Sequence, residues 1–315
     1  MIGWVFPGQG SQHVGMGAGL ESREARDTLT EASEVLGWDV LRVCRDGPAE
    51  RLDSTEITQP AVVATSVAAA RTLESLGLRP DAVAGHSVGE FAALVVAGAM
   101  RFEDAMRAVA VRGEAMLRAG RAHTGGMAAV LGLPAGRVEE LCAAASGGVG
   151  PANLNGPEQV VVSGEDKAVA ELAAAARAEG GRVIRLKVSV PAHSALMAPA
   201  RDELARALEG VAFSAPRVRF FSGVTGRSHD RPGEIRELLV RGVTEPVRWM
   251  DAVLGMSWAG AELFVEAGPG EVLSGLVRRI APDAETAHVG EDAEARELAD
   301  RLVLVDGGRP GGSDR

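Results

Sequence analysis

The clearest structural signal in this chain is the stretch 85–89, Gly-His-Ser-Val-Gly. It follows the short apolar run 82–84 and precedes 90–94, Glu-Phe-Ala-Ala-Leu, which is typical of a helix. The pattern G-x-S-x-G between a strand and a helix predicts a nucleophile elbow, in which glycines permit a tight turn that lifts the serine hydroxyl out of the fold. The free N–H groups at the start of the helix would stabilise negative charge there. The alternative is a Gly-Ser turn that only caps a helix, but the context favours Ser87 as a nucleophile.

The flanking regions alternate in the same way between short apolar runs and longer helical segments. The runs 3–6, 82–84 and 262–266 each lead into glycine or proline, which is typical of buried parallel strands whose ends open into functional loops. Helices are expected between them, among others at 60–76 and 102–119. We therefore expect an α/β fold with a large α/β-hydrolase-like domain built on a parallel sheet.

The segment 125–189 has a different order of elements. Strand and helix patterns follow one another there as β-α-β-β-α-β, which is the ferredoxin-like arrangement. We therefore predict a small ferredoxin-like subdomain at 125–189, inserted into a large catalytic domain formed by 1–124 and 190–305, with the site in the cleft between them. The tail 306–315 contains mainly glycine, proline and charged residues, so we expect it to be disordered.

Composition excludes several classes of protein. The net charge of −10 argues against a general nucleic-acid binder, which needs basic surface to neutralise phosphates. The longest apolar stretch, 91–100, is about half of a membrane span, and the N-terminus lacks the basic region of a signal peptide. Cys44 and Cys142 lie among apolar or small residues, which predicts buried thiols in a reducing compartment. We expect a cytoplasmic monomer that binds neither nucleic acid nor a membrane.

A serine hydroxyl needs a base to take its proton, and histidine is the usual one. The chain has six histidines. His86 adjoins the serine and cannot readily reach it across the strained turn. His193 lies in 190–197, Val-Pro-Ala-His-Ser-Ala-Leu-Met, where a proline stops an extended segment. The residues alone rank His193 first and leave open the others, which are His13, His123, His229 and His288.

Two further features are ambiguous when read alone. Arg112 lies on an otherwise mostly apolar helical segment, and the common fate of such an arginine is to extend from the helix face into solvent. The loop 6–12, Phe-Pro-Gly-Gln-Gly-Ser-Gln, could cradle a phosphate. Neither a P-loop lysine nor dinucleotide-type glycine spacing follows it, so we discount nucleotide binding.

Taken together, these segments resemble the malonyl-CoA:acyl carrier protein transacylase family, which includes the acyltransferase domains of polyketide synthases and the free-standing versions that serve them in trans. Several motifs in register are far more specific than any one of them. The resemblance covers residues 3 to about 280, and its markers follow the family's order: 6–12, Thr58-Gln59-Pro60, 85–89, Arg112, Asn153-Leu154-Asn155, 159–161, 190–197 and 266–270.

The resemblance implies a role for each group of the site. Ser87 would be the nucleophile and His193 the general base, oriented by the backbone carbonyl of Gly242, where the family often has glutamine. The backbone N–H groups of Gln9 and Val88 would bind the oxyanion.

The resemblance also implies how the substrate is held. Arg112 would pair with the free carboxylate of a malonyl group. Ala192 occupies a position associated with the choice between malonyl and methylmalonyl groups, and its small side chain leaves both open. The remaining residues expected to line or brace the pocket are Gln59, His86, Met116 and Asn155.

The implied activity is transfer of a malonyl or 2-substituted malonyl group from a coenzyme A thioester to the phosphopantetheine thiol of an acyl carrier protein, through an acyl-serine. No metal and no bound cofactor is needed for this exchange. The alternatives are an editing acyl hydrolase, against which Arg112 argues, and a non-catalytic carrier-protein binding module, against which Ser87 and His193 argue. Because carrier proteins are usually acidic, docking needs a local basic patch, and Arg278 and Arg279 are candidates for it.

Overall fold

The structure is a computed structural model that describes residues 1–186, 188 and 190–307. Its larger sheet has six strands in the order β10-β9-β1-β2-β7-β8, all parallel to their neighbours except the edge strand β8. This is the expected α/β architecture, and it brings the carboxyl ends of β1 and β2 together, where the elbow begins. The strands are β1 (Ile2–Phe6), β2 (Ala82–Gly85), β7 (Arg219–Phe221), β8 (Ser228–His229), β9 (Leu263–Ala267) and β10 (Glu285–Val289).

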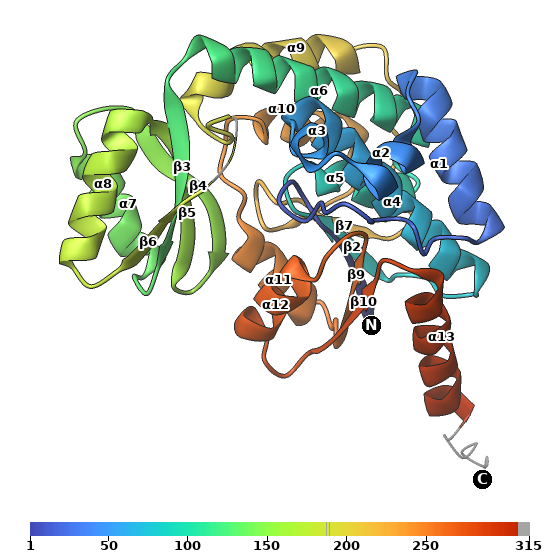
Figure 1. Ribbon diagram of the computed structural model, residues 1–315. Coiled ribbons are helices and arrows are strands. Elements are labelled where there is room, and N and C mark those ends of the chain that lie inside the picture. The colour runs from blue at the N-terminus through green and yellow to red at the C-terminus, as the bar shows by residue number, and fades with distance from the viewer. Residues whose placement is uncertain (187, 189, 308–315) are drawn as a thin grey trace.

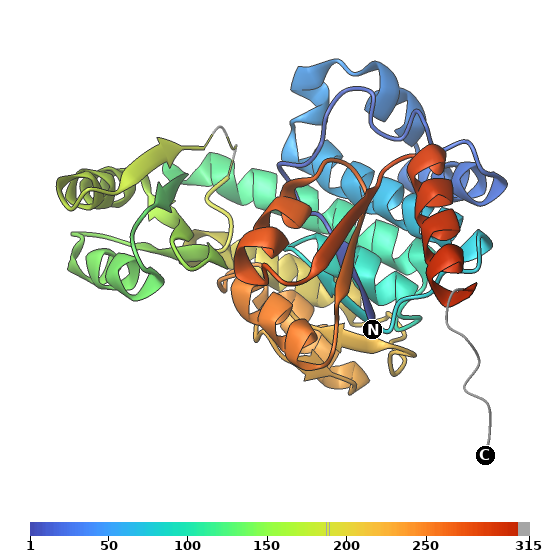
Figure 2. The ribbon, with the colours of Figure 1, turned by 90° about the horizontal axis from the view of Figure 1, so that it is seen from below.

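Helices cover both faces of this sheet (Figures 1 and 2). Side chains alternate between the faces along a strand, so Trp4 and Phe6 join the core formed with α1, α4, α5 and α6, whereas Val5 joins the core formed with α11 and α12. The helices of this part are α1 (Arg23–Leu36), α2 (Val40–Asp46), α3 (Ala49–Leu52), α4 (Thr55–Ser75), α5 (Gly89–Val96), α6 (Phe102–Ala122), α9 (Ala198–Leu208), α10 (Pro232–Arg241), α11 (Trp249–Trp258), α12 (Val272–Ile280) and α13 (Asp292–Gly307).

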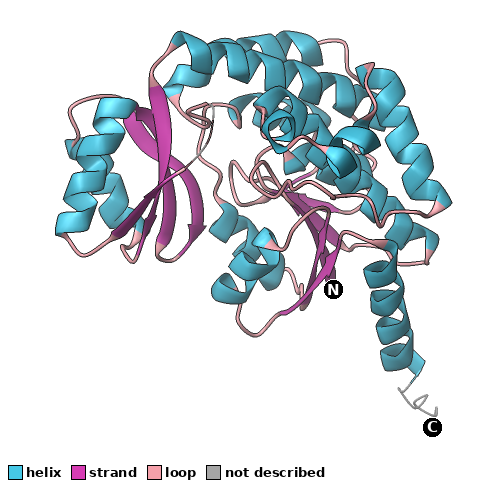
Figure 3. Ribbon diagram, in the orientation of Figure 1, coloured by secondary structure: helices cyan, strands magenta, loops and turns pink. Residues whose placement is uncertain are grey.

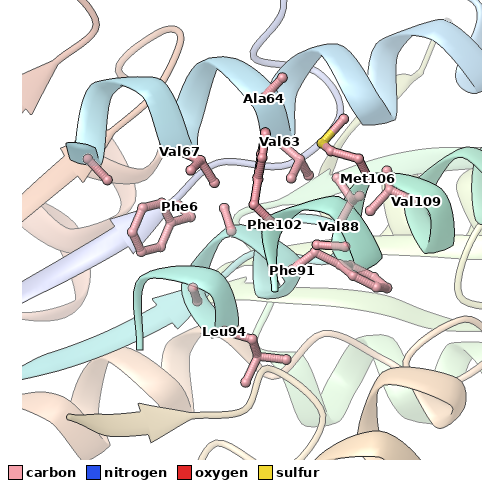
Figure 4. Close-up of a cluster of buried hydrophobic side chains, with 14 of the residues drawn as sticks. Phe6, Val63, Ala64, Val67, Val88, Phe91, Leu94, Phe102, Met106 and Val109 are labelled. Carbon is pink, nitrogen blue, oxygen red and sulfur yellow. The ribbon is translucent and has the colours of Figure 1, made fainter. Parts of the chain in front are cut away.

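The hydrophobic core fixes the residues that follow Ser87 in the elbow. Val88 is fully buried and Phe91 almost fully, and both pack among side chains of β1, α4 and α6 (Figure 4). Burial of a side chain of this size contributes roughly 1.5–3 kcal/mol. The residues on both sides of the serine turn are therefore fixed by packing, and the turn has little freedom to relax.

The second sheet has four antiparallel strands in the order β4-β5-β3-β6, with α7 and α8 packed on it to form a separate core (Figure 3). The order along the chain is the expected β-α-β-β-α-β. The elements are β3 (Gly125–Leu131), α7 (Ala135–Ala144), β4 (Val149–Gly156), β5 (Gln159–Glu165), α8 (Asp166–Ala178) and β6 (Arg182–Arg185). Strand β4 meets the larger part through Val247, whose N–H donates to the Ala152 carbonyl and whose carbonyl accepts from the Leu154 N–H, each at 2.8 Å.

Two expected boundaries differ from the structure. Helix α4 begins at Thr55 rather than at Pro60, because the turn before the proline is already helical and the Thr58 hydroxyl donates to the carbonyls of Leu52 and Ser54. Helix α13 continues to Gly307, so the first two residues of the expected tail 306–315 are helical, and the rest lie outside the described residues. Among the helices that the structure describes, none combines the length and apolar character needed to cross a bilayer.

Candidate active site

The turn at Ser87 is strained and is enforced by its glycine neighbours. Ser87 has φ of 55°, in the left-handed region that costs a non-glycine residue about 1–3 kcal/mol. A Cβ at Gly85 would lie 2.1 Å from the Glu90 nitrogen, and one at Gly89 would lie 2.2 Å from the Phe6 carbonyl oxygen. Only glycine fits either position, so the sequence G-x-S-x-G is required by close backbone packing around the serine.

His193 reaches Ser87 from a distant part of the chain. Its Nε2 lies 2.8 Å from the Ser87 Oγ, and its own φ is 58°. Its Nδ1 lies 3.1 Å from the Glu245 carbonyl oxygen, and its backbone N–H donates to the Val243 carbonyl at 3.2 Å. A carbonyl can only accept, so the ring proton is on Nδ1, and Nε2 is left to accept the serine proton. This is the geometry of a serine and its general base.

Two backbone carbonyls act on the His193 ring: that of Glu245, 3.1 Å from Nδ1, and that of Gly242, the residue implied by the resemblance. Gly242 is the C-cap of α10 and donates its N–H to the Leu238 carbonyl at 2.8 Å. The chain then turns, with the Glu245 N–H donating to the Arg241 carbonyl at 2.9 Å. This turn places the carbonyls of Gly242 and Glu245 near His193.

The imidazole of His193 is held neutral. Burial, the positive charge of Arg112 and, to a smaller extent, His86 together lower its pKa to about 3, against the opposing effect of the carbonyls of Glu245 and Gly242. A base whose pKa lies below its usual value keeps its free electron pair at lower pH.

This pKa predicts an unusual pH dependence for the acylation of Ser87. Between pH 7 and pH 5 we expect kcat/KM to change by less than about twofold, whereas a histidine of ordinary pKa would lose about 25-fold of its neutral form. Quenched-flow measurement of Ser87 acylation at several pH values checks this. A steep loss centred near pH 6.5 would contradict it.

Arg112 points inward from α6 and is only 3% exposed, so the alternative of an arginine extended into solvent is wrong. Its Nη1 donates to the Gln59 Oε1 at 2.5 Å, and its Nη2 donates to the Ser87 Oγ at 3.1 Å. Burial lowers its pKa to about 10, partly offset by the charge of Glu90, so the guanidinium stays protonated at neutral pH. The Gln59 amide is held in turn by the Met116 sulfur at 3.4 Å. A fixed positive charge therefore faces the serine hydroxyl.

His86 connects the elbow to the smaller sheet. Its Nε2 lies 2.9 Å from the Asn155 Oδ1 on β4, and its ring packs on Trp249 with 5.5 Å between ring centres. Burial lowers its pKa, which favours the uncharged ring, while the hydrogen bond to Asn155 acts in the opposite direction. A Cβ at Gly8 would lie 2.5 Å from the His86 carbonyl oxygen, so the loop after β1 also packs closely here. His86 and Asn155 brace the site.

The N–H groups of Gln9 and Val88 lie in the two loops at the ends of the paired strands β1 and β2. Within residues 1–186, 188 and 190–307, neither N–H donates to a protein acceptor. The Gln9 side chain is held by the Thr55 hydroxyl at 3.2 Å. Two backbone donors beside a serine can stabilise an oxyanion.

A cavity of about 90 Å³ opens between these groups. A larger hollow of about 610 Å³ lies over α1, away from them, and offers no comparable set of reactive groups. The predicted residues that line the small cavity are Gln9, Gln59, His86, Ser87, Arg112, Met116, Ala192 and His193; the lining residues not singled out from the sequence are Met127, Asn153, Leu186, Val188 and Val190. Asn153 and Val190 lie in motifs quoted above, whereas the other apolar residues carry no signal that distinguishes them from core residues.

The sequence pattern of the acyl transferase domain family matches residues 3–294. The chain belongs to this family. The match covers both sheets, the strained serine and the histidine, so the described site lies wholly within the acyl transferase domain.

Individual relatives of this acyltransferase cover nearly its whole length. The malonyl CoA-acyl carrier protein transacylase of Salmonella typhimurium is 42% identical over 296 residues, which are 92% of this chain and 96% of that protein. The solved structure of the malonyl CoA-acyl carrier protein transacylase of Coxiella burnetii is similar with a TM-score of 0.93 and 39% identity, over 96% of this chain and 97% of that one. A malonyl-transacylase solved in complex with its type II PKS acyl carrier protein, PlMCAT with AntF, is similar with a TM-score of 0.91 and 39% identity, over 95% and 99% of the two chains.

The two arginines considered for docking face different neighbours on the acyltransferase. The Nη1 of Arg278 donates to the Thr286 hydroxyl on β10 at 2.9 Å. The Nη1 of Arg279 donates to the Gln159 Oε1 on β5 at 2.8 Å, beside an open cavity of about 360 Å³ that also contacts Asn155. Of the two arginines, Arg279 lines the cavity that is shared with Asn155, the hydrogen-bond partner of His86.

Proposed function

We propose that this acyltransferase moves a malonyl group from coenzyme A to the phosphopantetheine thiol of an acyl carrier protein, through an acyl-serine at Ser87. The observation that carries the proposal is the buried guanidinium of Arg112, whose Nη2 lies 3.1 Å from the Ser87 Oγ. A malonyl thioester has a carboxylate two carbons from its reacting carbonyl, so a cation beside the nucleophile suits it. The names of the relatives agree with this substrate and partner.

In the first half-reaction, the Ser87 Oγ attacks the thioester carbonyl carbon while the His193 Nε2 takes the hydroxyl proton. The imidazolium is stabilised by the Glu245 carbonyl at Nδ1, and the N–H groups of Gln9 and Val88 stabilise the oxyanion. The C–S bond then breaks, and the leaving sulfur takes the proton from Nε2. The products are the malonyl ester of Ser87 and free coenzyme A.

In the second half-reaction, the phosphopantetheine thiol of the carrier protein gives its proton to the His193 Nε2 and attacks the ester carbonyl. The same two N–H groups stabilise the oxyanion. The ester C–O bond breaks, and the Ser87 oxygen regains the proton from Nε2. The exchange of one thioester for another is nearly balanced in energy, so the residues need only stabilise charge and move a proton.

The cavity supports a small acyl group. Its volume is about 90 Å³. The small side chain of Ala192 leaves space in the cavity beside His193. Met127 of β3 lines another part of the cavity. We propose malonyl as the preferred group and a 2-substituted malonyl group as the alternative, and competition between malonyl-CoA and methylmalonyl-CoA for Ser87 distinguishes them.

A single labelling experiment tests the activity. The protein is incubated with malonyl-CoA labelled in the malonyl group, the label on Ser87 is measured, and carrier protein bearing phosphopantetheine is then added. Movement of the label from Ser87 to the carrier supports the proposal. Release as free malonate would instead indicate an editing hydrolase, and an unlabelled Ser87 would indicate a non-catalytic binding module.

Reversing the charge of Arg279 tests where the carrier protein docks. We expect Arg279→Glu to raise the KM for carrier protein about tenfold, since loss of a charge pair at an interface costs on the order of 1.4 kcal/mol or more. The KM for malonyl-CoA stays unchanged. Arg278→Glu is the matched control, because the neighbouring arginine faces β10. Equal effects of the two substitutions would contradict docking on the Arg279 side.

A further inference from the structure

Glu90 is a buried acid that the mechanism above does not use. It lies in the first turn of α5, three residues after Ser87, and is 4% exposed. One of its carboxylate oxygens, Oε1, accepts two hydrogen bonds, from the Gly223 N–H at 2.7 Å and from the Ser222 hydroxyl at 2.9 Å. Burial of a carboxylate costs desolvation free energy. Packing alone therefore does not explain a buried glutamate beside the proposed nucleophile.

The two hydrogen bonds lead from the elbow to the segment that orients the base. The Gly223 carbonyl accepts the Arg248 N–H at 2.6 Å, and Val247, the preceding residue, is bonded to β4 of the smaller sheet. Two residues before Val247 is Glu245, whose carbonyl lies 3.1 Å from the His193 Nδ1. The His193 Nε2 then meets the Ser87 Oγ at 2.8 Å, which closes a ring that began at the elbow helix.

We propose that Glu90 is a positioning residue, which ties the serine helix to segment 222–248 and so sets the place of the carbonyl that orients His193. It acts through Gly223 and Arg248 and does not touch the substrate. The inference rests on the proposed function, because it takes Ser87 and His193 as the reacting pair.

This role depends on the length of the Glu90 side chain, which places the acceptor oxygen, and does not depend on its charge. Burial raises the pKa of Glu90 to about 7, against the opposing effects of the Gly223 N–H, Ser222 and Arg112. The carboxyl is therefore protonated in part of the molecules at neutral pH. An oxygen that accepts from the Gly223 N–H is present in both protonation states, and in glutamine as well.

Two substitutions distinguish the effect of side-chain length at Glu90 from the effect of its charge. Glu90→Gln keeps the length and an acceptor oxygen and removes the charge, and we expect kcat within about threefold of the unchanged protein, since the acceptor is retained. Glu90→Asp keeps the charge and withdraws the oxygen by one methylene. We expect it to lower kcat by about 10- to 100-fold, the range that a displacement near 1 Å causes, with the KM for malonyl-CoA within about twofold.

Glu266 provides the matched control. It is fully buried, and its two oxygens accept from the N–H groups of Leu273 and Ser274 at 3.0 and 2.6 Å, at the start of α12. It takes part in none of the hydrogen bonds that connect Ser87 to His193 through Glu90. We expect Glu266→Asp to lower the midpoint of thermal unfolding about as much as Glu90→Asp does and to leave kcat unchanged.

The measurement is single-turnover labelling of Ser87 by malonyl-CoA, with thermal unfolding of each variant as a check on folding. The inference is overturned if Glu90→Gln is as slow as Glu90→Asp, if Glu90→Asp loses nothing, or if Glu266→Asp loses as much. Labelling of the unchanged protein separates the two proposals. If that protein is not labelled, the proposed function fails, and if it is labelled, the variants test Glu90 alone.

Discussion

Replacing His193 with alanine is expected to lower the rate of Ser87 acylation by malonyl-CoA by about 10²- to 10⁴-fold, the usual contribution of a positioned general base. The Ser87 hydroxyl would then lose its proton acceptor at 2.8 Å, and the nearest ring, that of His86, is bonded to Asn155. The affinity for malonyl-CoA should change little, because Arg112 and the two backbone N–H groups remain. Quenched-flow labelling of Ser87 measures both quantities.

His123→Ala is the control for this substitution. His123 is exposed, follows the last turn of α6 and does not line the cavity. We expect its removal to leave the acylation rate unchanged. If His193→Ala acylated Ser87 at the rate of the unchanged protein, another group would have to accept the proton, and the assignment of the base would be wrong.

Replacing Arg112 with alanine is expected to change the choice of acyl group as well as the rate. Loss of a buried charge partner costs about 2–5 kcal/mol, so kcat/KM for malonyl-CoA should fall by roughly 30- to 5,000-fold. Acetyl-CoA has no carboxylate to pair, so its kcat/KM should fall by far less, and the preference for malonyl over acetyl should collapse. The two thioesters compared at equal concentration, with carrier protein as acceptor, give this ratio directly.

Two variants show whether the charge or the shape of the guanidinium is responsible. Arg112→Lys keeps the charge but loses the planar fork, so we expect an intermediate loss of malonyl transfer. Arg118→Ala, on the same helix, removes an exposed arginine that pairs with Glu203 on α9 and should have no effect on the preference. An unchanged malonyl preference in Arg112→Ala would show that the carboxylate is held elsewhere.

The motif at 266–270 illustrates how a recognisable pattern can be structural. Glu266 caps the first N–H groups of α12, and Gly268 has φ of 137°. A Cβ at Gly268 would lie 2.3 Å from the Ser66 hydroxyl oxygen and 2.9 Å from Pro7, which precedes the loop of Gln9. Gly268 thus packs against the loop of a proposed oxyanion donor, whereas the Glu266 side chain is hydrogen-bonded to the start of α12 and not to that loop.

The order of elements and the tight turn around Ser87 could be read from the sequence. Glycines at 85 and 89 around a serine, after an apolar run and before a helix, indicate the elbow because these features depend on neighbours in the chain. The order β-α-β-β-α-β of the smaller unit follows from the same local periodicities. Helix boundaries were less certain, as the start of α4 before Pro60 shows, because side chains such as Thr58 stabilise a turn that propensity alone does not predict.

Only the tertiary structure decided which distant groups meet. From the residues alone Arg112 could equally extend into solvent, and its contact with Ser87 follows from the packing of α6 against α4 and α5. The His193 Nδ1 lies 3.1 Å from the carbonyl of Glu245, a residue not singled out from the sequence, and the Glu90 carboxyl accepts from the Gly223 N–H. The physical reason is that a sequence specifies backbone conformation residue by residue, whereas a hydrogen bond between remote residues depends on how whole helices and sheets pack, to within a fraction of an ångström.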